Sequence, residues 1–207
     1  MSGPDAGETG TEQLPAGTTP SQTVGPFFAF ALTPSAYDYP ALAGPDLRTD
    51  DAVGTQIVVE GRLLDGAGEA VPDAMIEVWQ ADGRGRYPGC APELANARFK
   101  GFGRSESLGG TWRFVTVKPG PVPGPGGTIQ APHLNVGVFA RGVLKRLFTR
   151  IYFDDEPANA GDPILHLVPA ERRPTLIARR DGTQDGLPRY VLDLRLQGED
   201  ETVFFEA

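Results

Sequence analysis

The chain has few of the residues that build disulfide frameworks and metal clusters. Its 207 residues include one cysteine, Cys90, and two histidines, His133 and His166. A single cysteine excludes an intrachain disulfide, so the cysteine content gives no sign of an oxidising compartment. No apolar run approaches the ~20 residues that a membrane-spanning helix needs. Because no charged segment followed by an apolar one opens the chain, we expect a cytoplasmic protein without a secretory signal.

Positive charge is also scarce, and it is not clustered. The chain carries 19 lysines and arginines against 27 acidic residues, a net charge of −8. Nucleic-acid-binding surfaces need grouped basic residues, so this balance argues against nucleic acid as a partner. Nucleophile-elbow, phosphate-loop and Cys-X-X-Cys patterns are missing as well, which argues against the common hydrolase, nucleotide-binding and dithiol classes.

Glycine and proline, in contrast, are abundant, with 27 and 20 copies. They are scattered between apolar runs, which indicates many turns between short strands. Residues 1–18 hold almost nothing to bury and are predicted to form a disordered tail. We expect residues 19–207 to form a single domain entered by an extended N-terminal arm. Residues 83–108 and 119–132 are predicted to be long irregular segments, which in compact domains are usually functional or disordered.

Alternating apolar and polar residues predict strands over most of the remaining chain. In one of them, Ile76 and Val78 are expected on the face opposite to Glu77 and Trp79. A hairpin turn is expected at Arg141-Gly142, and the one short helix over residues 173–179. Strands at this spacing with little helix predict an all-β fold with a β-sandwich core. The expected strands cover residues 56–64, 74–80, 111–118, 133–139, 144–153, 189–197 and 201–205.

Four segments in a fixed order carry a family signature. They are Glu77-Val-Trp-Gln-Ala-Asp82-Gly-Arg-Gly-Arg-Tyr87, Lys118-Pro-Gly-Pro-Val122, Gln130-Ala-Pro-His133-Leu-Asn135-Val136 and Leu147-Phe-Thr-Arg-Ile-Tyr152-Phe153. In this order and at this spacing, they resemble the intradiol ring-cleavage dioxygenases. The resemblance extends from about Thr19 to the C-terminus and implies an oxidoreductase that opens aromatic rings with O2.

The resemblance also implies where a metal site would lie. The family holds iron(III) with two tyrosines and two histidines, and the matching positions here are Tyr87, Val122, His133 and Asn135. Iron(III) is a hard cation that favours anionic oxygen donors together with imidazoles. Val122 offers no donor, and the neutral amide of Asn135 is a poor substitute for imidazole. The arginine that the family carries before its first histidine is replaced by Gln130, so we expect no metal site and no catalytic residue in this chain.

The same resemblance implies a role as the non-catalytic alpha subunit of a hetero-oligomer. A related beta chain would hold Fe(III) and cleave protocatechuate with O2 to 3-carboxy-cis,cis-muconate. Two residues of this chain are implied to wall the beta chain's pocket. They are Pro26 in the N-terminal arm and Arg141 in the hairpin after the histidine strand. A guanidinium at residue 141 would attract the carboxylate of the substrate.

Two other hypotheses stay open on the sequence. A β-sandwich with a decayed site can serve as a binding module for an aromatic ligand or a protein, and would then be a stable monomer. A divergent single-chain enzyme would instead hold iron through Tyr87 and His133 without any partner. Each residue also has a purely structural interpretation: a packed loop tyrosine, a hydrogen-bonded histidine, a stiffening Pro26 and a solvated turn residue Arg141.

Overall fold

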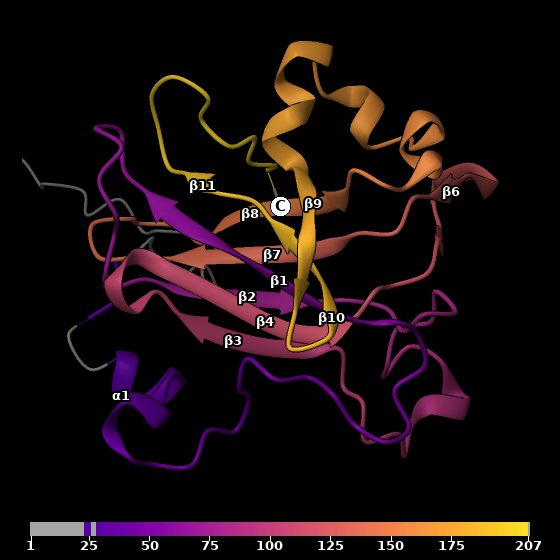
Figure 1. Cartoon of the computed structure of the whole chain (residues 1–207), viewed down its shortest axis with the longest axis horizontal. Helices are drawn as coiled ribbons and strands as arrows, with labels where there is room; N and C mark the ends of the chain where they lie inside the picture. Colours follow the sequence, from indigo (N-terminus) through magenta and orange to yellow (C-terminus); the bar gives the residue numbers. More distant parts are fainter. Residues whose placement is uncertain (1–22, 26–27, 207) are drawn as a thin grey trace, which may run out of the picture.

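A computed structural model describes residues 23–25 and 28–206 of the chain (Figure 1). The predicted tail over residues 1–18 and the candidate residue Pro26 lie outside the described residues. The described helices are α1 (Phe28–Leu32) and the 3-10 helices η1 (Pro34–Tyr37), η2 (Pro92–Leu94), η3 (Leu108–Gly110), η4 (Pro125–Gly127), η5 (Pro157–Gly161), η6 (Leu165–Leu167) and η7 (Ala170–Leu176). Among the described residues, no helix has the length and apolar character that crossing a membrane requires.

Strands dominate the described part of the chain. They are β1 (Gln56–Leu64), β2 (Met75–Trp79), β3 (Phe102–Glu106), β4 (Thr111–Val117), β5 (Val122–Pro123), β6 (Ile129–Gln130), β7 (Leu134–Phe139), β8 (Leu147–Phe153), β9 (Ile177–Gln184), β10 (Leu187–Val191) and β11 (Leu194–Arg195). The prediction of an all-β protein with little helix is therefore confirmed.

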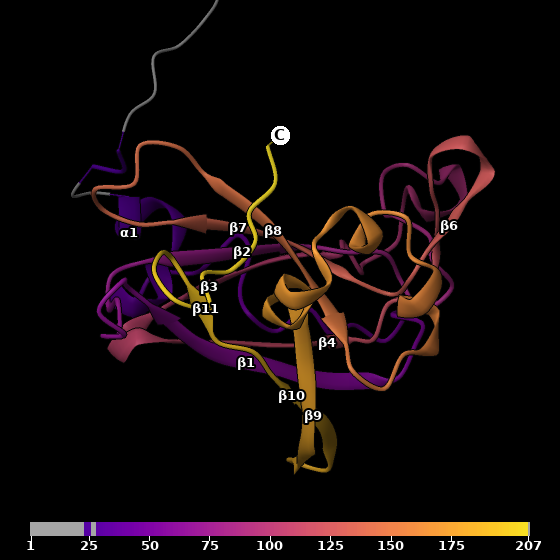
Figure 2. The ribbon, with the colours of Figure 1, turned by 90° about the horizontal axis from the view of Figure 1, so that it is seen from above.

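The strands form two layers that face each other (Figure 2). One layer has the order β3-β2-β7-β8, and the other contains β4, β1 and β10. The strand β9 joins the layers because it pairs in parallel with β8 and antiparallel with β10. The result is a nearly closed β-sandwich, as predicted.

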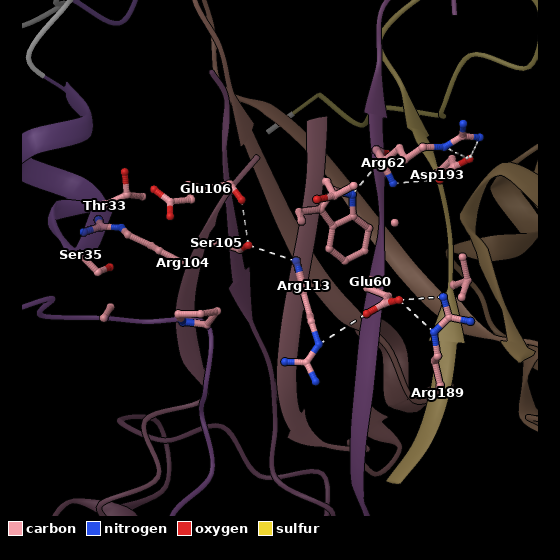
Figure 3. Close-up of a pocket in the computed structure, with 16 residues that line it drawn as sticks. Thr33, Ser35, Glu60, Arg62, Arg104, Ser105, Glu106, Arg113, Arg189 and Asp193 are labelled. Carbon is pink, nitrogen blue, oxygen red and sulfur yellow. Dashed lines mark hydrogen bonds and ion pairs between the residues drawn. The ribbon is translucent and has the colours of Figure 1, made fainter. Parts of the chain in front are cut away.

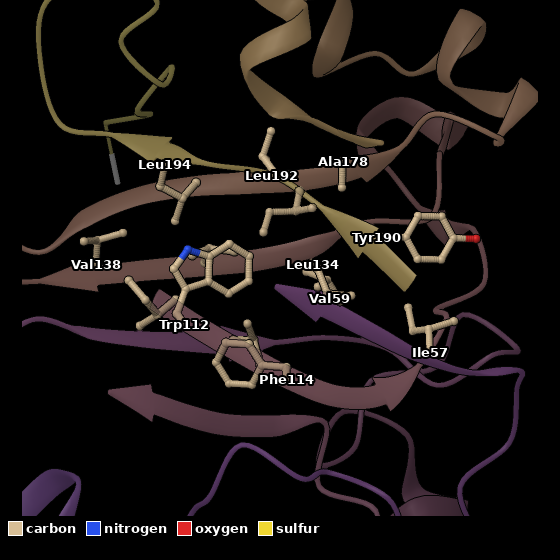
Figure 4. Close-up of a cluster of buried hydrophobic side chains, with 14 of the residues drawn as sticks. Ile57, Val59, Trp112, Phe114, Leu134, Val138, Ala178, Tyr190, Leu192 and Leu194 are labelled. Carbon is tan, nitrogen blue, oxygen red and sulfur yellow. The ribbon is translucent and has the colours of Figure 1, made fainter. Parts of the chain in front are cut away.

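The main core fills the space between these layers (Figure 4). Trp112 and Phe114 project into it from β4 and are at most 1% exposed. On β2, Ile76 and Val78 are buried whereas Trp79 is 42% exposed, as the alternation predicted. Burying each large apolar side chain contributes roughly 1.5–3 kcal/mol, so this layer contact supplies most of the driving force for folding.

Several sequence predictions of secondary structure were wrong; one of them is the irregular segment 119–132, which contains the short β5–β6 ladder. The helix expected over residues 173–179 is instead η7, which ends at Leu176 and leads directly into β9. Residues 201–205 do not form a strand; Phe205 makes an isolated bridge with Phe148 instead. The irregular segment 83–108 contains β3, which pairs with β2 along its whole length. In each case pairing with distant strands decides the outcome, and local sequence patterns do not report it.

Gly61 marks a close approach between β1 and the break that separates β10 from β11. A Cβ added at Gly61 would lie 1.8 Å from the backbone oxygen of Leu192. We expect Gly61→Ala to destabilise the fold by about 2 kcal/mol, because the obstacle is backbone and has to move. Thermal unfolding measures this as a midpoint lowered by roughly 4–8 °C. Gly161→Ala is the control, since a Cβ there has nothing within 4 Å; equal midpoints for both variants would contradict the close approach.

Candidate functional site

Two loops that are distant in sequence bring Tyr87 and Val122 to one place. The carboxylate of Asp82 accepts hydrogen bonds from within the loop that precedes Tyr87, including one of 3.0 Å from the backbone of Arg86. The same loop packs on the Lys118–Val122 segment at Gly85, which has φ +75° and where a Cβ would lie 1.9 Å from the Pro121 oxygen. Glycine is required here both for its backbone conformation and for the close contact.

The histidine segment places the other two positions beside Tyr87. Asn135 lies on β7 and His133 directly precedes that strand, so both point to the same face, as the two-residue period predicted. The Asn135 amide donates hydrogen bonds to the Tyr87 hydroxyl at 3.0 Å and to the Trp79 carbonyl at 3.2 Å. His133 is buried, and its Nδ1–H donates to the Ala131 carbonyl at 2.7 Å.

The structure thus gathers the four positions that the family resemblance singled out. Val122 is 3% exposed and pairs with Gln130 in the β5–β6 ladder. Tyr87 stacks at a ring-centroid distance of 4.3 Å on Trp79. We call this group of side chains, Tyr87, Val122, His133 and Asn135, the decayed centre.

A guanidinium also lies at the decayed centre, although residue 130 is not an arginine. Arg150 on β8 is the cross-strand partner of Asn135. Its Nη1 donates to Gln130 Oε1 at 2.6 Å and to the Tyr152 hydroxyl at 3.4 Å. Sequence reasoning gave Arg150 no role, because a contact between two strands across twenty residues has no local signal.

A buried carboxylate supports the segment that leads into His133. Asp162 is fully buried and accepts hydrogen bonds from the backbone of Ala131 and Leu165, both at 2.7 Å. The Tyr152 hydroxyl donates to the same carboxylate at 3.1 Å. These bonds fix the backbone around residue 131, whose carbonyl in turn orients His133. The Tyr152 position was present in the family signature, but its partner Asp162 was not predicted.

The donors at the decayed centre do not fit iron(III). Burial raises the pKa of Tyr87 above its ordinary value, and an Asn135 hydrogen bond only partly offsets this, so the phenol is neutral at pH 7. Burial, together with the Arg150 charge, lowers the pKa of His133 to about 4. No described group of three or more His, Cys, Asp or Glu residues could hold a metal ion. Even with Tyr87 ionised by a metal, one phenolate and one imidazole beside a guanidinium would leave most of a trivalent charge uncompensated.

The low pKa of His133 makes folding stability depend on pH. In the unfolded state His133 takes up a proton near pH 6.5, whereas in the folded state it does so only near pH 4. The stabilisation is therefore complete above pH 6.5 and is lost as the pH falls through about 4, a loss of roughly 3 kcal/mol. Urea unfolding at pH 7 and pH 4 measures this loss of unfolding free energy. Because carboxylates titrate too, the test compares wild type with His133→Gln; the same pH dependence in both proteins would contradict the shift.

Arg141 lies at the opposite end of β7 from the decayed centre. It occupies the turn after that strand, with its side chain 71% exposed, and forms an ion pair with Asp73. The next residue, Gly142, contacts the N-terminal arm, because its backbone N–H donates a hydrogen bond to Thr23 Oγ1 at 2.9 Å. Pro26 itself is not described. The described residue Thr23 thus lies beside the Arg141-Gly142 turn.

A cavity of about 710 Å³ lies elsewhere, over β1, β3, β4 and β10 (Figure 3). None of the four positions of the decayed centre lines it. Its arginines are engaged by carboxylates: Arg62 with Asp193, Arg104 with Glu77, and Arg113 and Arg189 with Glu60. Each of these arginines is therefore paired with a carboxylate, while burial raises the pKa of Glu106, a carboxyl that also lines the cavity.

The fold and the arrangement of these four positions are those of an intradiol-type dioxygenase chain. Residues 24–198 match the sequence family described as Dioxygenase, and the chain belongs to that family. It is 49% identical over 196 residues to the protocatechuate 3,4-dioxygenase alpha chain of Burkholderia cepacia, covering 91% of this chain and 97% of that one. To the beta chain of the same enzyme and organism it is 35% identical over 165 residues, covering 75% and 70%.

The fold itself is shared with solved dioxygenase structures. One of them is the dioxygenase domain of a dioxygenase–carbohydrate-binding protein fusion from Streptomyces sp. SirexAA-E. It superposes with a TM-score of 0.58 at 24% identity and covers 77% of this chain and 93% of that one. At this identity the likeness concerns the β-sandwich alone.

Proposed function

We propose that this chain is the non-catalytic alpha subunit of a cytoplasmic protocatechuate 3,4-dioxygenase. The observation that carries the proposal is the decayed centre: Val122 and Asn135 stand where the family has a tyrosine and a histidine. The greater similarity to an alpha chain than to a beta chain supports the same assignment. Fe(III) is then held by the beta chain, and this chain alone is inactive.

The proposed enzyme opens the aromatic ring of protocatechuate between its two hydroxylated carbons. Both atoms of O2 enter the product, 3-carboxy-cis,cis-muconate. The contribution of this chain is to complete the pocket of the beta chain at the subunit junction. Arg141 attracts the substrate carboxylate, and Pro26 forms part of the wall. The exposure of Arg141 and the attachment of the arm at Gly142 support this placement.

Co-production with the beta chain of the same operon or organism tests the proposal. We expect the two chains to co-elute in equal amounts within a larger hetero-oligomer and to cleave protocatechuate with consumption of O2. The chain produced alone is expected to show no such activity. A stable monomer that does not bind the beta chain would instead favour the alternative, a β-sandwich binding module for a ligand or protein.

A further inference from the structure

Asp73 and Arg141 face each other at one end of the β2–β7 ladder. The last antiparallel pair of that ladder joins Met75 to Phe139. Asp73 and Arg141 each lie two residues beyond this pair, in the turns that adjoin β2 and β7. Their side chains, 68 residues apart in sequence, form an ion pair because the two turns lie side by side at the end of the ladder.

The backbone on the Asp73 side is firmly held. Ala74, the next residue, is 3% exposed and its N–H donates to Ser107 Oγ at 2.9 Å. The Ser107 N–H donates in return to the Ala74 carbonyl at 2.9 Å. Asp73 therefore projects from a fixed point, and its carboxylate can direct a flexible partner.

The backbone on the Arg141 side is held as well. The Val143 N–H donates to the Ala140 carbonyl at 3.2 Å and closes the turn. Gly142 has φ +80°, which glycine adopts without strain, and it bonds Thr23 of the arm. What remains free is the long side chain of Arg141, whose rotamer freedom would oppose ligand binding unless something reduced it.

The contact with Asp73 uses one edge of the guanidinium only. The Nε–H of Arg141 donates to Asp73 Oδ2. Among the described residues, no further hydrogen bond or ion pair of Arg141 is found, and its side chain is 71% exposed. The two terminal nitrogens are therefore available, and their planar fork matches a carboxylate in bidentate geometry.

We propose that Asp73 is the positioning residue for Arg141, an inference that rests on the proposed function. Asp73 holds the Nε edge so that the outer edge of the guanidinium faces the carboxylate of the catechol substrate. The pair thereby selects a carboxylated catechol over one without a carboxylate. Asp73 itself does not touch the substrate, so its effect is on binding and not on the chemical step.

Steady-state kinetics of the assembled enzyme test this role with protocatechuate and with unsubstituted catechol. Asp73→Ala is expected to raise the KM for protocatechuate roughly fivefold, the size of a lost exposed ion pair, with kcat unchanged. Asp73→Asn keeps an oxygen acceptor for Nε and is expected to restore part of the affinity. The KM for catechol is expected to stay the same in both variants. Asp50→Ala, which removes the exposed partner of Arg98, is the matched control.

Different outcomes would contradict the role of Arg141 in the pocket and the positioning role of Asp73. If Arg141→Ala leaves the KM for protocatechuate unchanged, the role of Arg141 in the pocket is wrong. If Arg141→Ala raises the KM but Asp73→Ala does not, or lowers it, only the positioning role is wrong. Equal changes for both substrates would show a general structural effect and overturn the proposal as well. When Arg141 is already alanine, we expect Asp73→Ala to add nothing.

Discussion

Replacing Arg141 with alanine is expected to raise the KM of the assembled enzyme for protocatechuate by roughly tenfold to a hundredfold. A hydrogen-bonded charge pair between guanidinium and carboxylate contributes about 1.5–3 kcal/mol to binding. The carboxylate does not take part in ring opening, so its contact is equally strong in the ground and transition states. Loss of such uniform binding raises KM and leaves kcat nearly unchanged.

The measurement is initial-rate kinetics at several ionic strengths. Added salt is expected to raise the wild-type KM and to affect Arg141→Ala less, because the screened attraction is already gone. Arg179→Ala serves as the control, since Arg179 is an exposed arginine of β9 that pairs with Asp181. An unchanged KM in Arg141→Ala would remove this residue from the pocket while leaving the subunit assignment in place.

Restoring the two missing ligand types is expected to fall short of restoring iron binding. In Val122→Tyr with Asn135→His, the new imidazole would lie beside Arg150, its cross-strand partner. Facing side chains on paired strands have Cβ atoms about 4.5–5.5 Å apart, so the guanidinium would oppose a trivalent cation at close range. Val122 is also buried, and a tyrosine there has to displace its neighbours.

We therefore expect little iron in that double variant and a clear gain when Arg150→Gln is added. Iron is counted per chain, and tyrosinate coordination is detected by visible absorbance. The chain is purified alone so that no other metal site contributes. Arg179→Gln in place of Arg150→Gln controls for a general loss of positive charge. One iron per chain in the double variant with Arg150 intact would show that the decayed centre is only two ligands short.

Much of the fold could be predicted from the sequence because alternation is a local property. The strand expected over residues 56–64 is β1 with both ends correct, and the turn at Arg141-Gly142 separates β7 from β8. The strand β9 was missed because it begins in an arginine-rich stretch, and pairing with β8 and β10 stabilises it. Such pairing depends on segments far away in the chain, which no window of sequence contains.

The candidate site could also be predicted only in part from the sequence. The resemblance located Tyr87 and His133, and the structure brings both to one place with Val122 and Asn135. The supporting residues were not predictable: Arg150, Asp162 and Asp73 act through contacts that depend on strand register or on loops packing together. Identifying them requires the three-dimensional structure, since their partners Gln130, Ala131 and Arg141 lie twenty or more residues away from them in sequence.

Iron content is the most direct test of the claim that this chain is a subunit without its own metal. The chain is produced alone and together with the beta chain, and iron and visible absorbance are measured per chain. The account predicts a colourless, iron-free lone chain, and a coloured complex with one iron for each pair of alpha and beta chains. One iron per chain in the lone protein would contradict it and would make Tyr87 and His133 metal ligands.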